Sequence, residues 1–218
     1  MGERVVVSIE STPKKTFASA MDWPGWSRSG KGEAEALERL AGYADRYRSV
    51  ARSAREALPT DPIEFDVQEH IAGGAGTEYG VPSAVTALDR HAVSAAEADR
   101  IARLVEAAWE TFDRVAAAAP AELRKGPRGG GRDRDKMIGH VIESDHAYAR
   151  EIGIRLPTPS IADRAAVETE RAAILDLLRT PSDGSPLADR RWTLRYVARR
   201  IAWHALDHAW EIEDRTEP

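Results

Sequence analysis

The stretch from Trp192 to Arg215 constrains the fold more than any other part of the chain. It reads WTLRYVARRIAWHALDHAWEIEDR, contains neither Gly nor Pro, and is long enough for about six helical turns. One row of this predicted helix has alternating spacings of three and four residues, as in the buried seam of a helix bundle. The row consists of Leu194, Val197, Ile201, His204, His208 and Glu211. Two imidazoles therefore stand where Leu or Ile would be expected.

The spacing of His204 and His208 has two interpretations. Residues four apart project from one face of a helix, roughly 6 Å apart along its axis, so both rings are able to hold one metal ion. Buried histidines are also common as core residues with hydrogen-bonded partners, and the spacing alone leaves both interpretations open. A third ligand elsewhere in the chain would favour a metal site.

The composition is that of an ordinary globular protein, and it excludes several kinds of site. The chain has 218 residues, of which 42% are hydrophobic and 31% charged, and its net charge of -5 argues against a general affinity for nucleic acid. It contains no Cys, so any metal must be held by His and carboxylates. We expect a cytoplasmic protein, because MGERVVVSIE resembles no signal peptide and no apolar run approaches the ~18 residues of a membrane span.

Residues 1–80 are predicted to form a small α+β domain. The predicted elements are a hairpin of Val5–Ile9 and Thr16–Trp23, a helix over Glu33–Ala54 and a third strand over Ile63–Val67. This ββαβ order predicts a three-stranded sheet crossed by one helix.

The sharp corner Asp22-Trp23-Pro24-Gly25-Trp26 lies inside this domain. We expect its two Trp side chains to cap a small core, with ligand binding as the alternative. The surrounding stretch MDWPGWSRSGKGEAEALERLAGY resembles the HicB antitoxin fold, in which a D-x-P-G corner and a following Gly lead into a helix of the form EAxxxL. The resemblance implies the fold alone, because the toxin partner and DNA-binding tail of that family have no counterpart in this sequence.

Residues 81–218 are predicted to be all-helical. The expected helices are Ser83–Ala119, in which Ser94 offers a cap for a restart, Asp133–Gly153 with an Asp at its N-cap, Ile161–Leu178, and the helix that Trp192 opens. Four helices joined by short to medium loops predict a four-helix bundle, and the fold class is α+β. We expect the two regions to fold separately, with their boundary between Gly73 and Pro82.

The second bundle helix offers the third candidate ligand. Its inward stripe consists of Met137, Val141, Ser144 and Tyr148. His140 flanks this stripe, whereas His146 is rotated about 120° away from His140, so we expect only His140 to face the bundle interior. A hydrogen bond from His140 to a neighbouring helix is the alternative. His91 is a weaker candidate, and His70 is expected to be exposed.

One His near the start of the second bundle helix, followed by HxxxH in the last helix, resembles the DinB/YfiT-like superfamily over roughly residues 82–216. In that superfamily such a triad holds a divalent metal inside a four-helix bundle, and the corresponding residues here are His140, His204 and His208. Members include S-transferases and isomerases that use mycothiol, bacillithiol or glutathione. The resemblance therefore implies a divalent ion, with zinc or nickel expected, a low-molecular-weight thiol and a small-molecule substrate.

The chemistry of three neutral imidazoles is consistent with such an activity. They leave a bound ion with open positions, at which the pKa of a coordinated water or thiol falls. Glu211, one turn beyond His208, is a candidate catalytic base, and a salt bridge to Arg215 is an equally open alternative. Asp207 or Glu211 is also able to orient a ligand histidine.

The run LRKGPRGGGRDRDK leads into the helix that carries His140. Glycine-rich loops before helices can bind anions through their backbone N–H groups. Arg128, Arg132 and Arg134 are the candidates for binding a carboxylate or phosphate of a substrate or thiol cofactor. A solvated loop without a ligand is the alternative.

Three functions remain open at this point. The first is a metal-dependent thiol S-transferase, isomerase or hydrolase-like enzyme. The second is a non-enzymatic module in which the HicB-like domain binds a protein partner or RNA and the bundle is a dimerising scaffold. The third is a metal-stabilised structural protein without turnover. We expect a homodimer that binds neither membrane nor, given its charge, nucleic acid.

Overall fold

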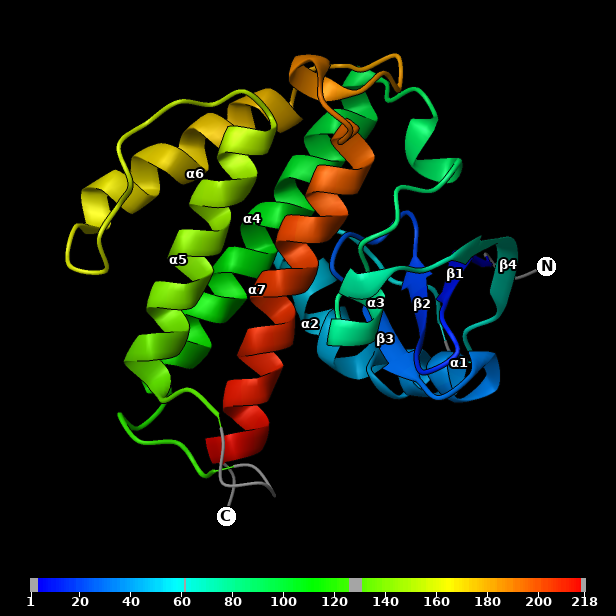
Figure 1. Cartoon of the computed structure of the whole chain (residues 1–218), viewed down its shortest axis with the longest axis horizontal. Helices are drawn as coiled ribbons and strands as arrows, with labels where there is room; N and C mark the ends of the chain where they lie inside the picture. The colour runs from blue at the N-terminus through cyan, green and yellow to red at the C-terminus, as the bar shows by residue number, and fades with distance from the viewer. Residues whose placement is uncertain (1–3, 61, 126–130, 217–218) are drawn as a thin grey trace.

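A computed structural model describes residues 4–60, 62–125 and 131–216 and shows a sheet domain beside a group of long helices (Figure 1). The sheet domain consists of β1 Val5–Ser11, β2 Thr16–Ala20, β3 Ser27–Gly30, α1 Glu33–Gly42, α2 Ala44–Ser53 and β4 Phe65–Ala72. After the short α3 Ala75–Tyr79, the helical region consists of α4 Ala95–Ala118, α5 Arg134–Glu151, α6 Arg164–Leu178 and α7 Leu194–Thr216. The predicted α+β class, with a sheet domain before a mostly helical region, is confirmed.

The sheet has four strands in the order β3-β2-β1-β4. Strands β1 and β2 form the predicted antiparallel hairpin, and β4 pairs with β1 in parallel. The prediction of three strands missed β3, whose residues Ser-Arg-Ser-Gly carry no β-branched or aromatic side chain. This strand is defined by its backbone pairing with β2, which no local sequence pattern shows.

The helix predicted over Glu33–Ala54 is two helices, α1 and α2, which meet at Tyr43. Gly42 precedes the break and lowers the local helix propensity. The Tyr43 ring packs against Trp210 of α7, with ring centroids 5.1 Å apart, and lies 3.8 Å from the Arg28 guanidinium. The break therefore belongs to the contact between the sheet domain and α7.

The Trp-Pro-Gly-Trp corner caps a core, as predicted. Trp26 is fully buried, stacks on Tyr47 with centroids 5.4 Å apart, and donates from Nε1 to the carbonyl of Leu40 at 2.9 Å. Gly25 has a φ of +96°, and a Cβ there would lie 2.7 Å from Cδ1 of Leu206. Only a glycine allows this corner to pack so closely against α7.

The first long helix begins later than predicted. It starts at Ala95, and Ser94 forms a capping box with Glu97: Ser94 N donates to Glu97 Oε2 at 3.0 Å, and Glu97 N donates to Ser94 Oγ at 3.3 Å. The predicted helix before Ser94 is wrong. That segment is irregular apart from one 3-10 turn over Leu88–Arg90.

The sheet domain and the helical region share one continuous hydrophobic core. Ion pairs cross between them, including Arg28–Asp207 at 2.9 Å and Arg46–Asp214 at 2.6 Å, so α7 contacts both parts. No helix in the described part of the chain combines the length and hydropathy that a bilayer crossing requires.

Separate folding of the two regions stays a prediction. Tyr79 lies inside the predicted boundary and is 88% exposed, so brief digestion with chymotrypsin should cut there. Two fragments that each unfold cooperatively are the expected result. If cleavage instead caused both fragments to lose their structure, the two regions would form one merged folding unit.

The buried carboxylate of Asp145 in α5 contacts side chains of both α4 and α6. Trp109 Nε1 donates to Asp145 Oδ2 at 2.9 Å, and Arg171 Nε lies 3.8 Å from the same oxygen. Burial raises the pKa of Asp145 to about 7, although the charge of Arg171 opposes the rise. Glu170 and Asp113 also act on this group and raise its pKa further.

Asp145 is therefore expected to destabilise the fold as pH rises. The pKa of its carboxyl is about 7 when folded against the ordinary value of 3.8, so between these values the folded state binds more protons and the free energy of unfolding falls. We expect the free energy of unfolding of Asp145→Asn, measured relative to the parent chain, to be up to roughly 4 kcal/mol higher at pH 8 than at pH 4. Urea unfolding at both pH values measures this difference, and an unchanged difference would contradict the assignment.

Candidate metal centre

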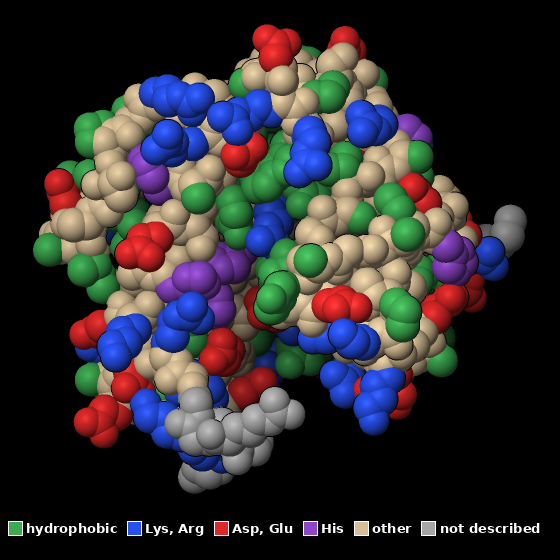
Figure 2. Space-filling model, in the orientation of Figure 1, with side chains coloured by type: hydrophobic (Ala, Val, Ile, Leu, Met, Phe, Trp, Pro, Cys, Tyr) green, Lys and Arg blue, Asp and Glu red, His purple; other side chains and the backbone are tan. Residues whose placement is uncertain are grey.

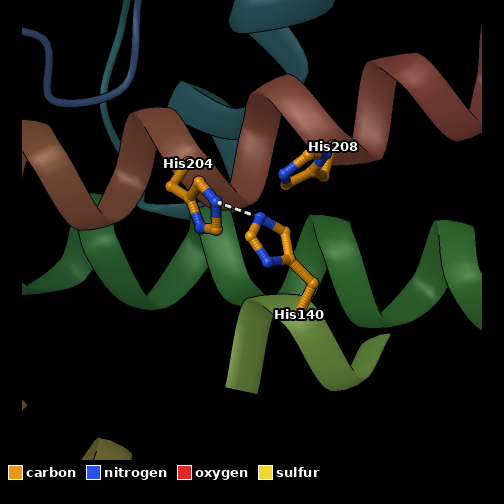
Figure 3. A group of neighbouring side chains, drawn as sticks. All are labelled: His140, His204 and His208. Atoms are coloured by element: carbon orange, nitrogen blue, oxygen red, sulfur yellow. Dashed lines mark hydrogen bonds between the residues drawn. The ribbon is translucent and has the colours of Figure 1, made fainter. Parts of the chain in front are cut away.

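The three predicted ligands lie together between α5 and α7. His140 extends from α5 toward His204 and His208 on α7 (Figure 3). Nε2 of His140 and Nε2 of His204 are 3.2 Å apart, and one ring nitrogen from each of the three residues lies within 4.8 Å of the others. The prediction that these three residues meet in the bundle is confirmed.

The spacing of the ring nitrogens fits a divalent ion. A tetrahedral zinc site with Zn–N bonds of about 2.0–2.1 Å places its ligand nitrogens roughly 3.3–3.4 Å apart, close to the observed distance between His140 and His204. Nδ1 of His204 is buried and has no hydrogen-bond partner among the described residues. His204 therefore presents a nitrogen atom whose polar requirement the surrounding described side chains do not meet.

The environment keeps two of the rings neutral. Burial, and then the charge of Arg132, lower the pKa of His140 to about 4. Burial likewise holds the pKa of His204 well below its usual range, and His208 and Arg200 add to the effect. Neutral imidazole is the form that coordinates a metal, so these two rings are ready to bind at neutral pH without losing protons.

Glu211 contacts the cluster through His208. Its Oε2 lies 3.1 Å from Nδ1 of His208, and its Oε1 accepts from Arg215 Nη1 at 2.9 Å. The hydrogen bond with His208 lowers the pKa of Glu211, so this side chain is a carboxylate at neutral pH. A carboxylate on Nδ1 leaves Nε2 of His208 for the cluster, the usual arrangement around ligand histidines. Asp207 instead pairs with Arg28.

His146 lies outside the cluster. Its Nδ1 is 2.6 Å from Glu170 Oε2 and its Nε2 is 3.1 Å from Thr158 Oγ1, so both ring nitrogens have partners. His70 lies in β4, is exposed and contacts Glu33 at 2.9 Å. Among the described residues, neither these two nor His91 joins a possible metal-binding group. His140 joins the cluster, as expected, but the expectation that only His140 faces the interior is wrong, because His146 is itself buried against Glu170 of α6 and His140 is partly exposed.

The arginines of the predicted anion-binding loop are placed differently from one another. Arg128 lies outside the described residues. Arg132 is exposed, and its charge acts on His140. Arg134 pairs with Asp135 at 2.8 Å and donates to the carbonyl of Ala119 at 3.0 Å, which holds its side chain at the start of α5. Asp133 stands at the N-cap as predicted, but its side chain makes no capping hydrogen bond.

Arg200 and Trp203 lie beside the cluster and were not predicted as site residues. The Arg200 guanidinium lies 5.1 Å from the ring centroid of Tyr148 and 5.2 Å from that of Trp203. Tyr148, which the inward stripe did include, meets His204 edge-on at 5.8 Å. The spacing could have indicated Arg200, because this residue precedes His204 by four positions and so projects from nearly the same side of the helix. Arg200 does not belong, however, to the row of residues with alternating spacings of three and four.

The cluster reaches the molecular surface. Figure 2 shows histidine side chains on the helical region at the edge of a hollow that faces the sheet domain, with Lys or Arg side chains on either side. His140 is partly exposed, whereas His204 and His208 are buried. A small molecule is thus able to approach the rings from solvent.

Comparison with known proteins finds no match to this chain: no family profile fits it, and neither a curated protein nor a solved structure is significantly similar. The function is therefore inferred from the chemistry of the histidine cluster.

Proposed function

We propose that the chain is a metal-dependent enzyme of the DinB-like type, a low-molecular-weight-thiol S-transferase or isomerase. His140, His204 and His208 would hold a divalent ion, zinc or nickel. The observation that carries this proposal is the meeting of three imidazoles from two helices, with ligand atoms within 4.8 Å of one another. An HxxxH pair in the last bundle helix with a His from the second matches the DinB/YfiT-like pattern.

A divalent ion at this position would act as a Lewis acid that lowers the pKa of a coordinated water or thiol. The protein supports that chemistry in three ways. His140 and His204 are held neutral by burial. The Glu211 carboxylate orients His208 through Nδ1. Arg132 and Arg200 place positive charge near the rings, where a thiolate or another anion would be stabilised.

The sheet domain contributes to the proposal through its fold. Its order of three strands, the helical segment of α1 and α2, and a fourth strand is compatible with the HicB-like resemblance of the DWPGW corner and the following helix. We propose that it supports α7, because its Arg28 holds Asp207 next to His208. Binding of RNA or a protein partner, and a homodimeric state, stay predictions.

Elemental analysis of protein purified without a His tag tests the first step. About one divalent ion per chain is expected, and chelation should remove it. Thiol-conjugation assays on metal-loaded and chelated protein then test turnover. Metal without any thiol-dependent reaction would favour the structural role, and absence of metal would contradict the proposal.

The catalytic role of Glu211 has its own test. A general base predicts that Glu211→Gln keeps the ion but loses turnover, because the amide accepts no proton at neutral pH. A purely orienting role predicts weaker metal binding, by roughly 10–100-fold, with turnover restored when the ion is in excess. The two outcomes separate the catalytic from the positioning role.

A further inference from the structure

Arg200 differs from the other arginines of α7. The others each pair with an acidic side chain: Arg195 with Asp22 and Glu97, Arg199 with Asp89, and Arg215 with Glu211. Arg200 makes no ion pair with any described residue, and its Nη1 is buried without a hydrogen-bond partner among them. Nε of Arg195 and Nη2 of Arg215 are also buried without a partner, so the feature that distinguishes Arg200 is the lack of an acidic partner, which a carboxylate ligand would supply.

The surroundings of Arg200 contain the Tyr148 hydroxyl, which interacts with the guanidinium, but no carboxylate among the described residues pairs with it. Its guanidinium packs against the rings of Tyr148 and Trp203. Nε1 of Trp203 is likewise buried without a partner in the described part of the chain. Arg200 precedes His204 by one helical turn, about 6 Å along the axis. The Arg200 guanidinium thus lies close enough to the histidine cluster for its charge to act on His204.

We propose that Arg200 binds a carboxylate group of the molecule that reacts at the histidine cluster, so that the substrate class is a small organic acid. A guanidinium presents parallel N–H groups that match the two oxygens of a carboxylate, and the neighbouring rings of Tyr148 and Trp203 restrict its movement. The inference rests on the proposed function in so far as the cluster is the reacting centre.

The position of Arg200 also limits the shape of the acid. If the carboxylate is held one helical turn from His204, the atom that reacts at the cluster must lie only a few bonds from that carboxylate in the same molecule. Arg200 and Arg132 both place positive charge near the rings, and this charge supplies the attraction for an anion. A neutral amide of the same shape lacks that attraction and leaves the guanidinium unpaired.

Calorimetric titration with short carboxylates from acetate to glutarate, and with acetamide as the neutral probe, tests this inference. Arg200→Gln should weaken carboxylate binding by about tenfold or more, and Arg200→Lys should lie between Gln and the parent chain. Arg191, an exposed residue just before α7, provides the matched control. Arg191→Gln removes the same charge and should change the affinity by less than about twofold.

The carboxylate has two possible sources, the acceptor substrate or the thiol. Sulfur-free acids stand for the acceptor, and N-acetylcysteine beside its amide stands for the thiol. An Arg200-dependent affinity for either acid supports the inference and identifies the source. Equal affinities of Arg200→Gln and the parent chain, or no saturable binding of any acid, would overturn it.

Metal content is measured on the same samples, so the two proposals fail separately. Protein that holds an ion but binds acids independently of Arg200 overturns the carboxylate site alone. Protein that holds no ion but binds acids through Arg200 overturns the metal centre and retains the carboxylate site.

Discussion

Replacement of His204 by Ala is expected to abolish stoichiometric binding of a divalent ion. The substitution removes the ring that lies 3.2 Å from His140 and borders His208, and the two remaining imidazoles come from different helices. Loss of an outer partner of a metal ligand typically costs roughly 10–100-fold in affinity, and loss of a ligand should cost more. Titration of zinc and nickel into untagged, chelator-treated protein measures the change.

His146→Ala is the matched control for this variant. Its ring is occupied by Glu170 and Thr158, so its removal should leave the metal affinity unchanged, although Glu170 then loses a partner in the core. Both variants also need comparison by thermal unfolding without metal. If His146→Ala lost the ion while His140→Ala and His204→Ala kept it, the cluster would not be the metal centre.

The candidate site was largely predictable because it depends on helix periodicity. His204 and His208 are four residues apart in a segment without helix breakers, so their common face followed from local geometry. The choice of His140 required only the apolar stripe of Met137 and Val141, both fully buried in the structure. Arg200 was missed because its distinguishing feature is the lack of an acidic partner among the described residues, which depends on every neighbouring element.

The parts of the fold that sequence did not show are fixed by contacts between distant residues. Strand β3 exists through its pairing with β2. The segment before α4 is irregular, and Glu10 of β1 anchors part of it by accepting from the backbone N–H groups of Ser83 and Ala84, both at 3.1 Å. Helical periodicity carries no information about such anchors, so the apolar residues near Leu88 were assigned to a helix.

Asp89 makes the most buried of these long-range contacts. Arg199 donates from Nε to Oδ1 at 2.8 Å and from Nη2 to Oδ2 at 2.6 Å, and both side chains are almost completely inaccessible. Asp89 Oδ2 also accepts from the backbone N–H of Thr86 at 2.9 Å. The pair thereby fastens the segment before α4 to α7.

Asp89→Ala is expected to lower the free energy of unfolding by about 3–5 kcal/mol, because it leaves the Arg199 guanidinium buried without a counter-charge. Urea unfolding of the metal-free protein measures the loss. Lys14→Ala is the control, since its pair with Glu78 is exposed and should contribute no more than about 1 kcal/mol.

The double variant Asp89→Leu, Arg199→Met separates the two sources of that loss. It removes both charges and keeps apolar volume at each position, so it should recover most of the stability if the unpaired guanidinium is responsible. A double variant as unstable as Asp89→Ala would show instead that the hydrogen bonds of Asp89 to the segment before α4 hold that segment in place. In that case the destabilisation would come from release of residues 83–93, and Arg199→Met alone would be far milder than Asp89→Ala.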